Sequence, residues 1–88
     1  MNITFSPEAQ EDYEYWKKTN PNIVKRIKLL LEDMCKHPYI GIGKPEKLKY
    51  DLAGKWSRRI TDIHRIVYFV DETEEDIFVL ALRYHYSK

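Results

Sequence analysis

Residues 56–86 read WSRRITDIHRIVYFVDETEEDIFVLALRYHY, and this part of the chain determines the architecture. Three runs within it, residues 56–60, 64–70 and 77–86, are rich in β-branched and aromatic residues, which is typical of strands. Polar turn residues separate the runs at 61–63 and, with many acids, at 71–76. Because short connections join antiparallel neighbours, this part of the chain is predicted to form an antiparallel sheet.

Upstream of this sheet the sequence predicts a short strand and the starts of two helices. Residues 2–5 alternate polar and apolar side chains, as a strand does. Ser6 before Pro7, and Asn20 before Pro21, are helix starts, because a Ser or Asn side chain accepts a backbone N–H and proline fits the first helical position.

Both predicted helices carry their apolar side chains on one face. The second helix ends at His37, which caps it, because a residue before proline leaves helical geometry. The apolar side chains are Ala9, Tyr13 and Trp16 in the first helix and Ile23, Val24, Ile27, Leu30, Leu31 and Met34 in the second.

The order of these elements predicts an α+β fold. Residues 38–45 hold two glycines and two prolines and are expected to form an irregular loop, and residues 48–52 to add one short strand. Two N-terminal helices would then pack on one face of a mostly antiparallel sheet of four to five strands. The other face of the sheet is left open.

Chain length and composition indicate one small domain over residues 1–88. The hydrophobic fraction of 43% is enough for a packed core. Cys35 is the only cysteine, so no internal disulfide can form, which fits a reducing cytosol. No leader peptide and no apolar run near 18 residues is visible, so we expect a cytoplasmic protein with no membrane partner.

A net charge of only +1 hides a segregation of charge along the chain. Residues 44–65 hold seven Lys and Arg against three Asp and Glu, whereas residues 1–16 and 71–76 are acidic. A basic stretch can bind a polyanion locally, because screening confines the field to roughly 8 Å. Taken in isolation, however, such a stretch is more often a solvated face.

One carboxylate, Glu46, lies among the lysines Lys44, Lys47 and Lys49. Neighbouring positive charge favours the ionised, proton-accepting form of a carboxylate. Such a group can act as a general base if a proton donor lies within hydrogen-bond reach. Without further support, a glutamate in a Gly/Pro loop is more often a surface charge.

Three arginines in the sheet are candidates for phosphate contact. Arg65 shares one strand face with Val67 and Phe69, and its guanidinium could match phosphate oxygens or simply reach for water at an edge. Arg58 and Arg59 are consecutive, so they point to opposite faces and at most one can line a given site.

The C-terminal residues include a candidate proton donor, His85. It sits near the chain end between tyrosines, and histidine titrates near neutral pH, although a terminal histidine without a role is about as common. Tyr86 could stack on a nucleobase. If the last strand continues through these residues, Arg83 shares a face with His85. His37 and His64 are interpreted as structural.

Several other classes of site are excluded by spacing. No His/Cys pair has metal-ligand spacing, so neither a metal nor another cofactor is expected. The segment from Gly41 to Lys44 lacks the rest of a phosphate-binding loop. The serines lack the context of a nucleophile elbow.

Taken together, four blocks resemble the YoeB/Txe toxins of the RelE superfamily of bacterial toxin–antitoxin systems. The blocks are GKPExLK at 43–49, LxGxWSRRIT at 52–61, HRxVY at 64–68 and RYHY at 83–86. The likeness extends to the N-terminal strand and to residues 12–16. Four ordered blocks make a specific signal.

The resemblance implies an endoribonuclease that cleaves mRNA codons in the ribosomal A site. It implies inhibition by a cognate YefM/Axe-like antitoxin, contact with operator DNA only through that antitoxin, and co-repression with it. It also leaves room for a homodimer.

The resemblance further implies roles for individual residues. Glu46 matches the general base, His85 the general acid, and Arg65 and Lys49 the phosphate-stabilising cations. Tyr86 matches a terminal tyrosine that shapes the site. Basic residues expected at the RNA are Lys44, Lys47, Arg59 and Arg83. The chain departs from the family pattern in ending with Ser87-Lys88 and in a slightly longer turn at 71–76.

Two other classes of function compete with this interpretation. A pure RNA-, ribosome- or antitoxin-binding module would use the basic residues for affinity alone, but it has no need of a carboxylate among lysines. A DNA-binding repressor is disfavoured, because no recognition helix is evident and the second helix carries mixed charge.

Overall fold

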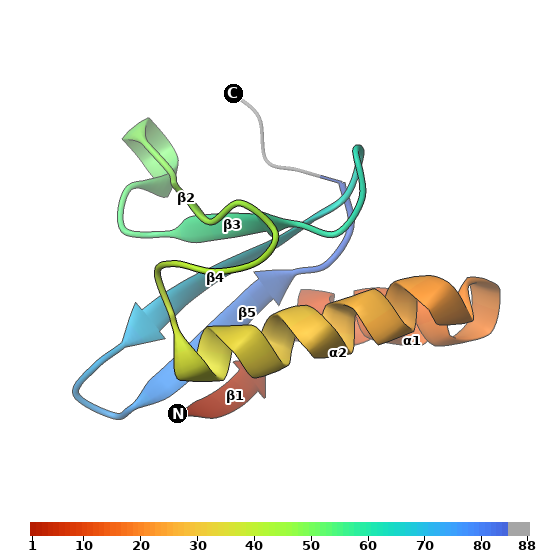
Figure 1. Cartoon of the computed structure of the whole chain (residues 1–88), viewed down its shortest axis with the longest axis horizontal. Coiled ribbons are helices and arrows are strands. Elements are labelled where there is room, and N and C mark those ends of the chain that lie inside the picture. Colours follow the sequence, from red (N-terminus) through yellow and green to blue (C-terminus); the bar gives the residue numbers. More distant parts are fainter. Residues whose placement is uncertain (85–88) are drawn as a thin grey trace.

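The computed structural model describes residues 1–84 of the chain. The elements form a sheet with two helices lying along one of its faces (Figure 1). In chain order they are β1 (Asn2–Phe5), α1 (Pro7–Thr19), α2 (Pro21–Lys36), β2 (Glu46–Lys47), a 3₁₀ helix η1 (Tyr50–Leu52), β3 (Trp56–Arg59), β4 (Arg65–Asp71) and β5 (Asp76–Ala81).

The sheet has five strands in the order β1-β5-β4-β3-β2. Strands β2 to β5 pair antiparallel, and only β1 runs parallel to its neighbour, β5. The parallel pair is secured by side chains, since the Thr4 hydroxyl donates to Asp76 Oδ1 at 3.1 Å. The α+β prediction, with a mostly antiparallel sheet of four to five strands, is therefore confirmed.

Both helix starts follow the predicted capping chemistry. The Ser6 hydroxyl oxygen accepts from the Ala9 amide at 3.0 Å. Asn20 Oδ1 accepts from the amides of Asn22 and Ile23. Asn20 alone separates the helices, so α2 must turn back along α1 (Figure 1).

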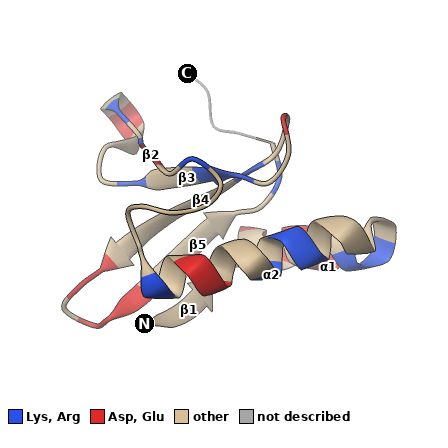
Figure 2. Cartoon of the chain, viewed as in Figure 1, with Lys and Arg blue, Asp and Glu red and all other residues tan. Residues whose placement is uncertain are grey.

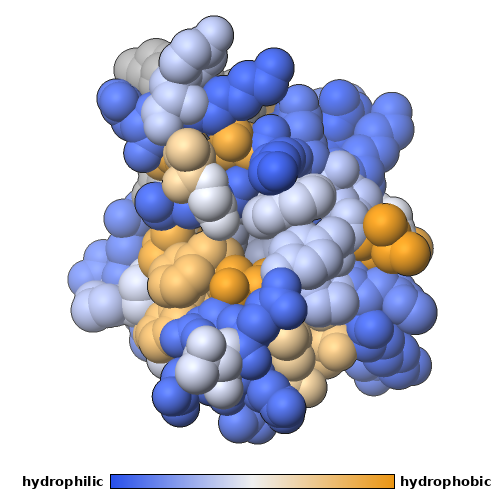
Figure 3. Space-filling view, turned by 90° about the vertical axis from the view of Figure 1, so that its left-hand side faces the viewer, coloured by the Kyte–Doolittle hydropathy of each residue, from blue (hydrophilic) through white to orange (hydrophobic). Residues whose placement is uncertain are grey.

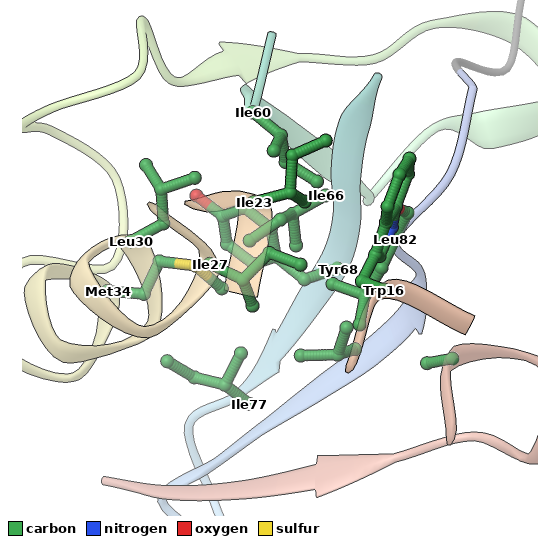
Figure 4. Close-up of a cluster of buried hydrophobic side chains, with 12 residues drawn as sticks. Trp16, Ile23, Ile27, Leu30, Met34, Ile60, Ile66, Tyr68, Ile77 and Leu82 are labelled. Atoms are coloured by element: carbon green, nitrogen blue, oxygen red, sulfur yellow. The ribbon is translucent and has the colours of Figure 1, made fainter. Parts of the chain in front are cut away.

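The core lies between the helices and the sheet (Figure 4). Alternation along β4 sends Ile66 and Tyr68 into this layer, where both are fully buried. The predicted apolar face of α2 is confirmed, and it supplies much of the core. The buried side chains of the cluster are Ala9, Trp16, Ile23, Ile27, Leu30, Met34, Ile60, Ile66, Tyr68, Ile77, Val79 and Leu82.

The last strand is shorter than predicted. The run 77–86 was expected to be one strand, but β5 ends at Ala81. The backbone of Leu82 is bonded to α1 instead of continuing the ladder: its N–H donates to Asp12 Oδ2 and its C=O accepts from Trp16 Nε1, both at 2.9 Å. Arg83 and Tyr84 therefore lie outside the strand, and the rest of the predicted run, residues 85 and 86, lies outside the described residues.

The predicted strand at 48–52 is also wrong. Strand β2 covers only Glu46–Lys47, and the chain then enters η1. Tyr50 has φ = 58°, in the left-handed region that a strand residue does not adopt. The Leu52 amide bonds back to the Lys49 carbonyl at 3.0 Å, which closes a turn where a strand was expected.

Within the described residues, neither helix is long and apolar enough to cross a bilayer.

Adjacent leucines on α2 test the packing of the core. Leu30 is fully buried, whereas Leu29 is 55% exposed. Leu30→Ala should lower the free energy of unfolding by about 2–5 kcal/mol, because it leaves a cavity between α2 and the sheet. Leu29→Ala should change it by less than about 0.5 kcal/mol. Urea denaturation of both variants measures the difference, and equal losses would contradict the packing described.

Candidate active site

Glu46 and Arg65 meet on the sheet face opposite the helices. The register of the strands determines this position. Glu46 pairs with Ser57 and Arg65 pairs with Arg59, and these two β3 residues lie on the same face of the sheet. Glu46 Oε1 lies 3.9 Å from Arg65 Nη1. The Arg65 side chain is 18% exposed and that of Glu46 is 67% exposed. A largely covered cation therefore stands beside a carboxylate that solvent and ligands can reach.

The alternation of the strands explains why this face is polar. Ile66 and Arg58 point toward the helices, so their neighbours Arg65, Ser57 and Arg59 point away. Beyond Arg65 the same face turns apolar, where Phe69 stacks on Phe78 with centroids 5.1 Å apart.

Basic residues flank Glu46 in the chain, and Arg59 pairs with Arg65 in the sheet. Lys44, Lys47, Lys49 and Arg59 are all exposed. Figure 2 shows Lys and Arg along β2, β3 and the loops beside them, with acids in the turn between β4 and β5. The charge segregation in the sequence is therefore also a segregation in space.

The loop that leads to Glu46 is wrapped around a buried arginine, Arg58. Its side chain is completely covered, and all five guanidinium N–H groups have acceptors. Three of the acceptors are carbonyls of the loop itself. The five are Tyr68 Oη at 3.2 Å, Asp33 Oδ2 at 2.6 Å, and the carbonyl oxygens of His37, Ile40 at 2.8 Å and Ile42 at 3.1 Å.

Close approach of this loop to Asp33 requires a glycine at position 41. A Cβ on Gly41, which has φ = 126°, would lie 1.9 Å from Asp33 Oδ2. The same carboxylate oxygen accepts the Ile42 amide at 3.1 Å. Its hydrogen bond from Arg58 holds the pKa of Asp33 below its usual value. Burial raises the pKa of the Tyr68 phenol, which donates to the Pro38 carbonyl at 2.8 Å.

An aromatic contact also holds Tyr39, between the loop residues whose carbonyls bind Arg58. The Tyr39 ring packs on Trp56 with centroids 5.0 Å apart, and its hydroxyl donates to Glu72 Oε2 at 2.6 Å. That bond raises the pKa of Tyr39 to about 12. Figure 3 shows pale and orange side chains in the middle of this side of the molecule, with hydrophilic ones around them.

The segment after β5 is fastened beside Arg65. The Arg65 amide donates to the Tyr84 carbonyl at 2.9 Å, and the Tyr84 amide donates to His64 Nδ1 at 2.7 Å. The Arg83 guanidinium lies over the Tyr15 ring of α1, 3.8 Å from its centroid. Arg83 is thus stacked against α1 and half-buried.

The structure brings some of the predicted residues together and leaves others outside its range. Glu46 and Arg65 are in contact, and the lysines and Arg59 lie on the same or adjoining segments. The Arg83 side chain packs against Tyr15 of α1. His85 and Tyr86 lie outside the described residues, which end at Tyr84 beside Arg65.

Four residues that hold these segments were not singled out as such from the sequence. Asp12 lies three residues after Ala9 on the apolar stripe of α1, and an acid in such a stripe is a detectable signal. Asp33 and Arg58 had no such signal, because their pairing spans 25 residues. His64 was interpreted as structural, with no partner assigned. In residues 1–84, no three His, Cys, Asp or Glu side chains are grouped to hold a metal ion.

The family model for the YoeB-like toxin of bacterial type II toxin-antitoxin systems matches residues 5–86. This chain belongs to that family. Toxin YoeB of Escherichia coli K12 is 48% identical over 86 residues, which cover 98% of this chain and 100% of that protein. Toxin YoeB of Streptomyces coelicolor is 45% identical over the same shares. The chain is therefore the toxin of a type II toxin–antitoxin system.

Solved structures of YoeB toxins share the whole fold. A YoeB/ParE toxin from Agrobacterium tumefaciens has a TM-score of 0.94 at 41% identity, covering 98% of this chain and 100% of that one. A YoeB-YefM complex from Staphylococcus aureus has 0.88 at 48%, covering 98% of each chain. A YoeB dimer from Staphylococcus aureus has 0.89 at 47%, again covering 98% of each. The toxin-antitoxin complex RelBE2 of Mycobacterium tuberculosis, at 21% identity and a TM-score of 0.72, shares the fold.

Substitutions of the consecutive residues Arg58 and Arg59 in this YoeB-like toxin should differ strongly in their effect on stability. Arg58→Ala leaves Asp33 and three carbonyls without their donor and should lower the free energy of unfolding by about 3–5 kcal/mol. Arg59→Ala removes an exposed side chain and should lower it by less than about 1 kcal/mol. Urea denaturation compares the two, and a stable Arg58→Ala protein would contradict the role assigned to this guanidinium.

The Asp33–Arg58 pair should also make stability depend on pH. The folded pKa of Asp33 lies below the ordinary value of 3.8, so its contribution is full above that value and is lost as pH falls through the folded pKa. Asp33→Asn should therefore be less stable than the wild type at pH 7, and the gap should shrink below about pH 4. Denaturation curves at pH 7 and pH 3 measure the gap, and a gap that does not narrow would refute the pairing.

Proposed function

We propose that this YoeB-like toxin is an endoribonuclease that cleaves mRNA in the ribosomal A site without a metal ion. The observation that carries the proposal is the contact of Glu46 with Arg65, at 3.9 Å, on an open sheet face bordered by lysines. An accessible carboxylate beside a largely covered guanidinium is suited to proton abstraction next to a phosphate.

The chemistry uses the nucleophile that RNA itself carries, the 2′-hydroxyl. Glu46 takes the proton of this hydroxyl, and the oxygen attacks the adjacent phosphorus. The bond from phosphorus to the 5′-oxygen breaks, and His85, in its protonated form, gives a proton to that leaving oxygen. The products are a 2′,3′-cyclic phosphate, or the 3′-phosphate formed from it by hydrolysis, and a 5′-hydroxyl.

Cations stabilise the negative charge that develops on the phosphate. Arg65 is already held beside Glu46 by its strand, so little reorganisation is needed when charge develops. Lys49 adds a second positive charge, and Tyr86 shapes the site around the leaving group. Lys44, Lys47, Arg59 and Arg83 serve affinity for the RNA backbone.

We further propose that a YefM-like antitoxin neutralises this toxin and that the pair represses its own operator through the antitoxin. The support is the YoeB-YefM complex of Staphylococcus aureus, whose toxin shares 48% of its residues with this chain. A homodimer is also proposed, on the likeness to the YoeB dimer of that organism. The cytoplasm, where mRNA and ribosomes lie, is the proposed location.

The alternative is a toxin that binds RNA, the ribosome or its antitoxin without cutting. Glu46 distinguishes a binding protein from an enzyme. A negative charge among lysines weakens binding to RNA, whereas cleavage requires a base. Removing this carboxylate should strengthen RNA binding in a binder and abolish the reaction in an enzyme.

Glu46→Gln tests the proposal directly. It keeps the shape of the side chain and removes the base, so cleavage on programmed ribosomes should fall by about 10²–10⁴-fold with the fold intact. Asp51→Asn, a change to an exposed acid in the same basic stretch, is the matched control and should cut normally. End-group mapping should find a cyclic or 3′-phosphate upstream and a 5′-hydroxyl downstream.

Two results would refute the proposed reaction. One is full activity of Glu46→Gln on programmed ribosomes. The other is persistent cleavage of an mRNA with a 2′-deoxy sugar at the scissile position, because that substrate lacks the nucleophile. Antitoxin binding by Glu46→Gln serves as the check that the protein is folded.

A further inference from the structure

His64 is a polar group that the proposed reaction does not use. It lies between β3 and β4, with its ring edge-on to Trp16 of α1 at 4.8 Å between centroids and 5.1 Å from the Tyr84 ring. Its Nδ1 accepts the Tyr84 backbone N–H at 2.7 Å. A ring nitrogen that accepts a hydrogen bond carries no proton. The contact therefore requires neutral His64, with its proton on Nε2.

This bond is one of two hydrogen bonds that the Tyr84 backbone makes with His64 and Arg65. The other runs in the opposite direction, from the Arg65 amide to the Tyr84 carbonyl at 2.9 Å. Tyr84 itself has φ = 56°, a left-handed conformation that costs free energy for a residue other than glycine. The two bonds therefore hold a conformation that the backbone does not favour by itself.

We propose that neutral His64 is a positioning residue for the reaction: its Nδ1 fixes Tyr84 beside Arg65, and protonation of His64 breaks this bond and lowers the rate of cleavage. The inference rests on the proposed function, since Tyr84 immediately precedes the proposed general acid in the chain. His64 itself touches no reacting atom. Its effect reaches the reaction through the backbone of one residue.

Protonation would oppose this bond directly. Imidazolium carries N–H groups on both ring nitrogens, so Nδ1–H would face the Tyr84 N–H donor to donor. The groups around the ring set how easily this happens. Burial and the Arg83 guanidinium lower the pKa of His64, and the Asp12 carboxylate of α1 acts in the opposite direction. Burial is the largest influence, so the pKa of His64 lies below its usual value of 6.5, in agreement with the neutral ring that the hydrogen bond requires.

Two substitutions separate hydrogen bonding from titration. In His64→Asn, Oδ1 stands as many bonds from the backbone as Nδ1 does in histidine, so it can accept the Tyr84 amide, but it does not titrate near neutral pH. His64→Ala removes the acceptor altogether. His37→Asn is the matched control, because His37 is an exposed histidine at the end of α2, far from His64 in the chain.

The measurement is the pH dependence of kcat and KM for cleavage on programmed ribosomes between pH 5 and pH 8. At pH 7, His64→Ala should lose about tenfold in kcat with KM nearly unchanged, and His64→Asn should recover most of the loss. Below pH 6.5 the wild type and His37→Asn should lose activity together, whereas His64→Asn should hold its activity to lower pH. Equal activity of His64→Ala and wild type, or one pH profile for all variants, would overturn the proposal.

A second readout does not depend on cleavage. In ¹⁵N-detected NMR of the toxin at neutral pH, His64 should carry its proton on Nε2. The Tyr84 amide should lose protection from hydrogen exchange as His64 protonates. A proton on Nδ1 at neutral pH would refute the positioning role. Protection of the Tyr84 amide that stays constant while His64 titrates would also refute it. If wild-type toxin cuts no RNA while these NMR results hold, the proposed function fails and the His64–Tyr84 linkage stands.

Discussion

The burial of one guanidinium, that of Arg58, is the constraint on which the proposed site depends. A charged group without water is costly unless it is paired and every donor is bonded. Asp33 and Tyr68 supply two acceptors, and the main chain of the loop after α2 supplies three. Because three of these acceptors are carbonyls of the loop, the contacts restrict the path of the loop around the guanidinium. That path ends where Glu46 enters the sheet edge, within reach of Arg65.

The same principle holds at the other end of the proposed site. Beyond β5 the chain leaves the ladder of the sheet, so its backbone groups need other partners. Asp12 and Trp16 of α1 satisfy Leu82, and His64 and the Arg65 amide satisfy Tyr84. The loop that precedes Glu46 and the described residues after β5, Leu82 to Tyr84, are both irregular backbone. They are held by side chains of α1, α2, β3 and β4, by His64 in the β3–β4 connection and by the Arg65 amide.

The parts of the fold that depend on neighbouring residues could be predicted from the sequence. Prediction failed where groups distant in the chain compete for the same backbone hydrogen bonds. Ser6, Asn20 and the apolar face of α2 act within a few residues, so capping and periodicity located both helices. The end of β5 was misplaced because Asp12 captures the Leu82 amide from 70 residues away. Of the site, adjacency of Glu46 to the lysines was visible in the sequence, but its contact with Arg65 depends on the register of three strands.

Charge placement determines how a nearly neutral protein can face a polyanion. Basic side chains lie along β2, β3 and their loops, with others on α1 and α2, whereas the turn between β4 and β5 carries acids (Figure 2). Because screening limits electrostatic interactions to roughly 8 Å, an approaching polyanion would interact with the nearest lysines more than with the net charge of +1. In the proposed reaction, the acids of that turn would repel RNA that approaches there, and the field would favour an approach that brings phosphate to Arg65. A uniformly basic protein of this size would bind RNA on every face, and few of those encounters would place the scissile bond beside Glu46.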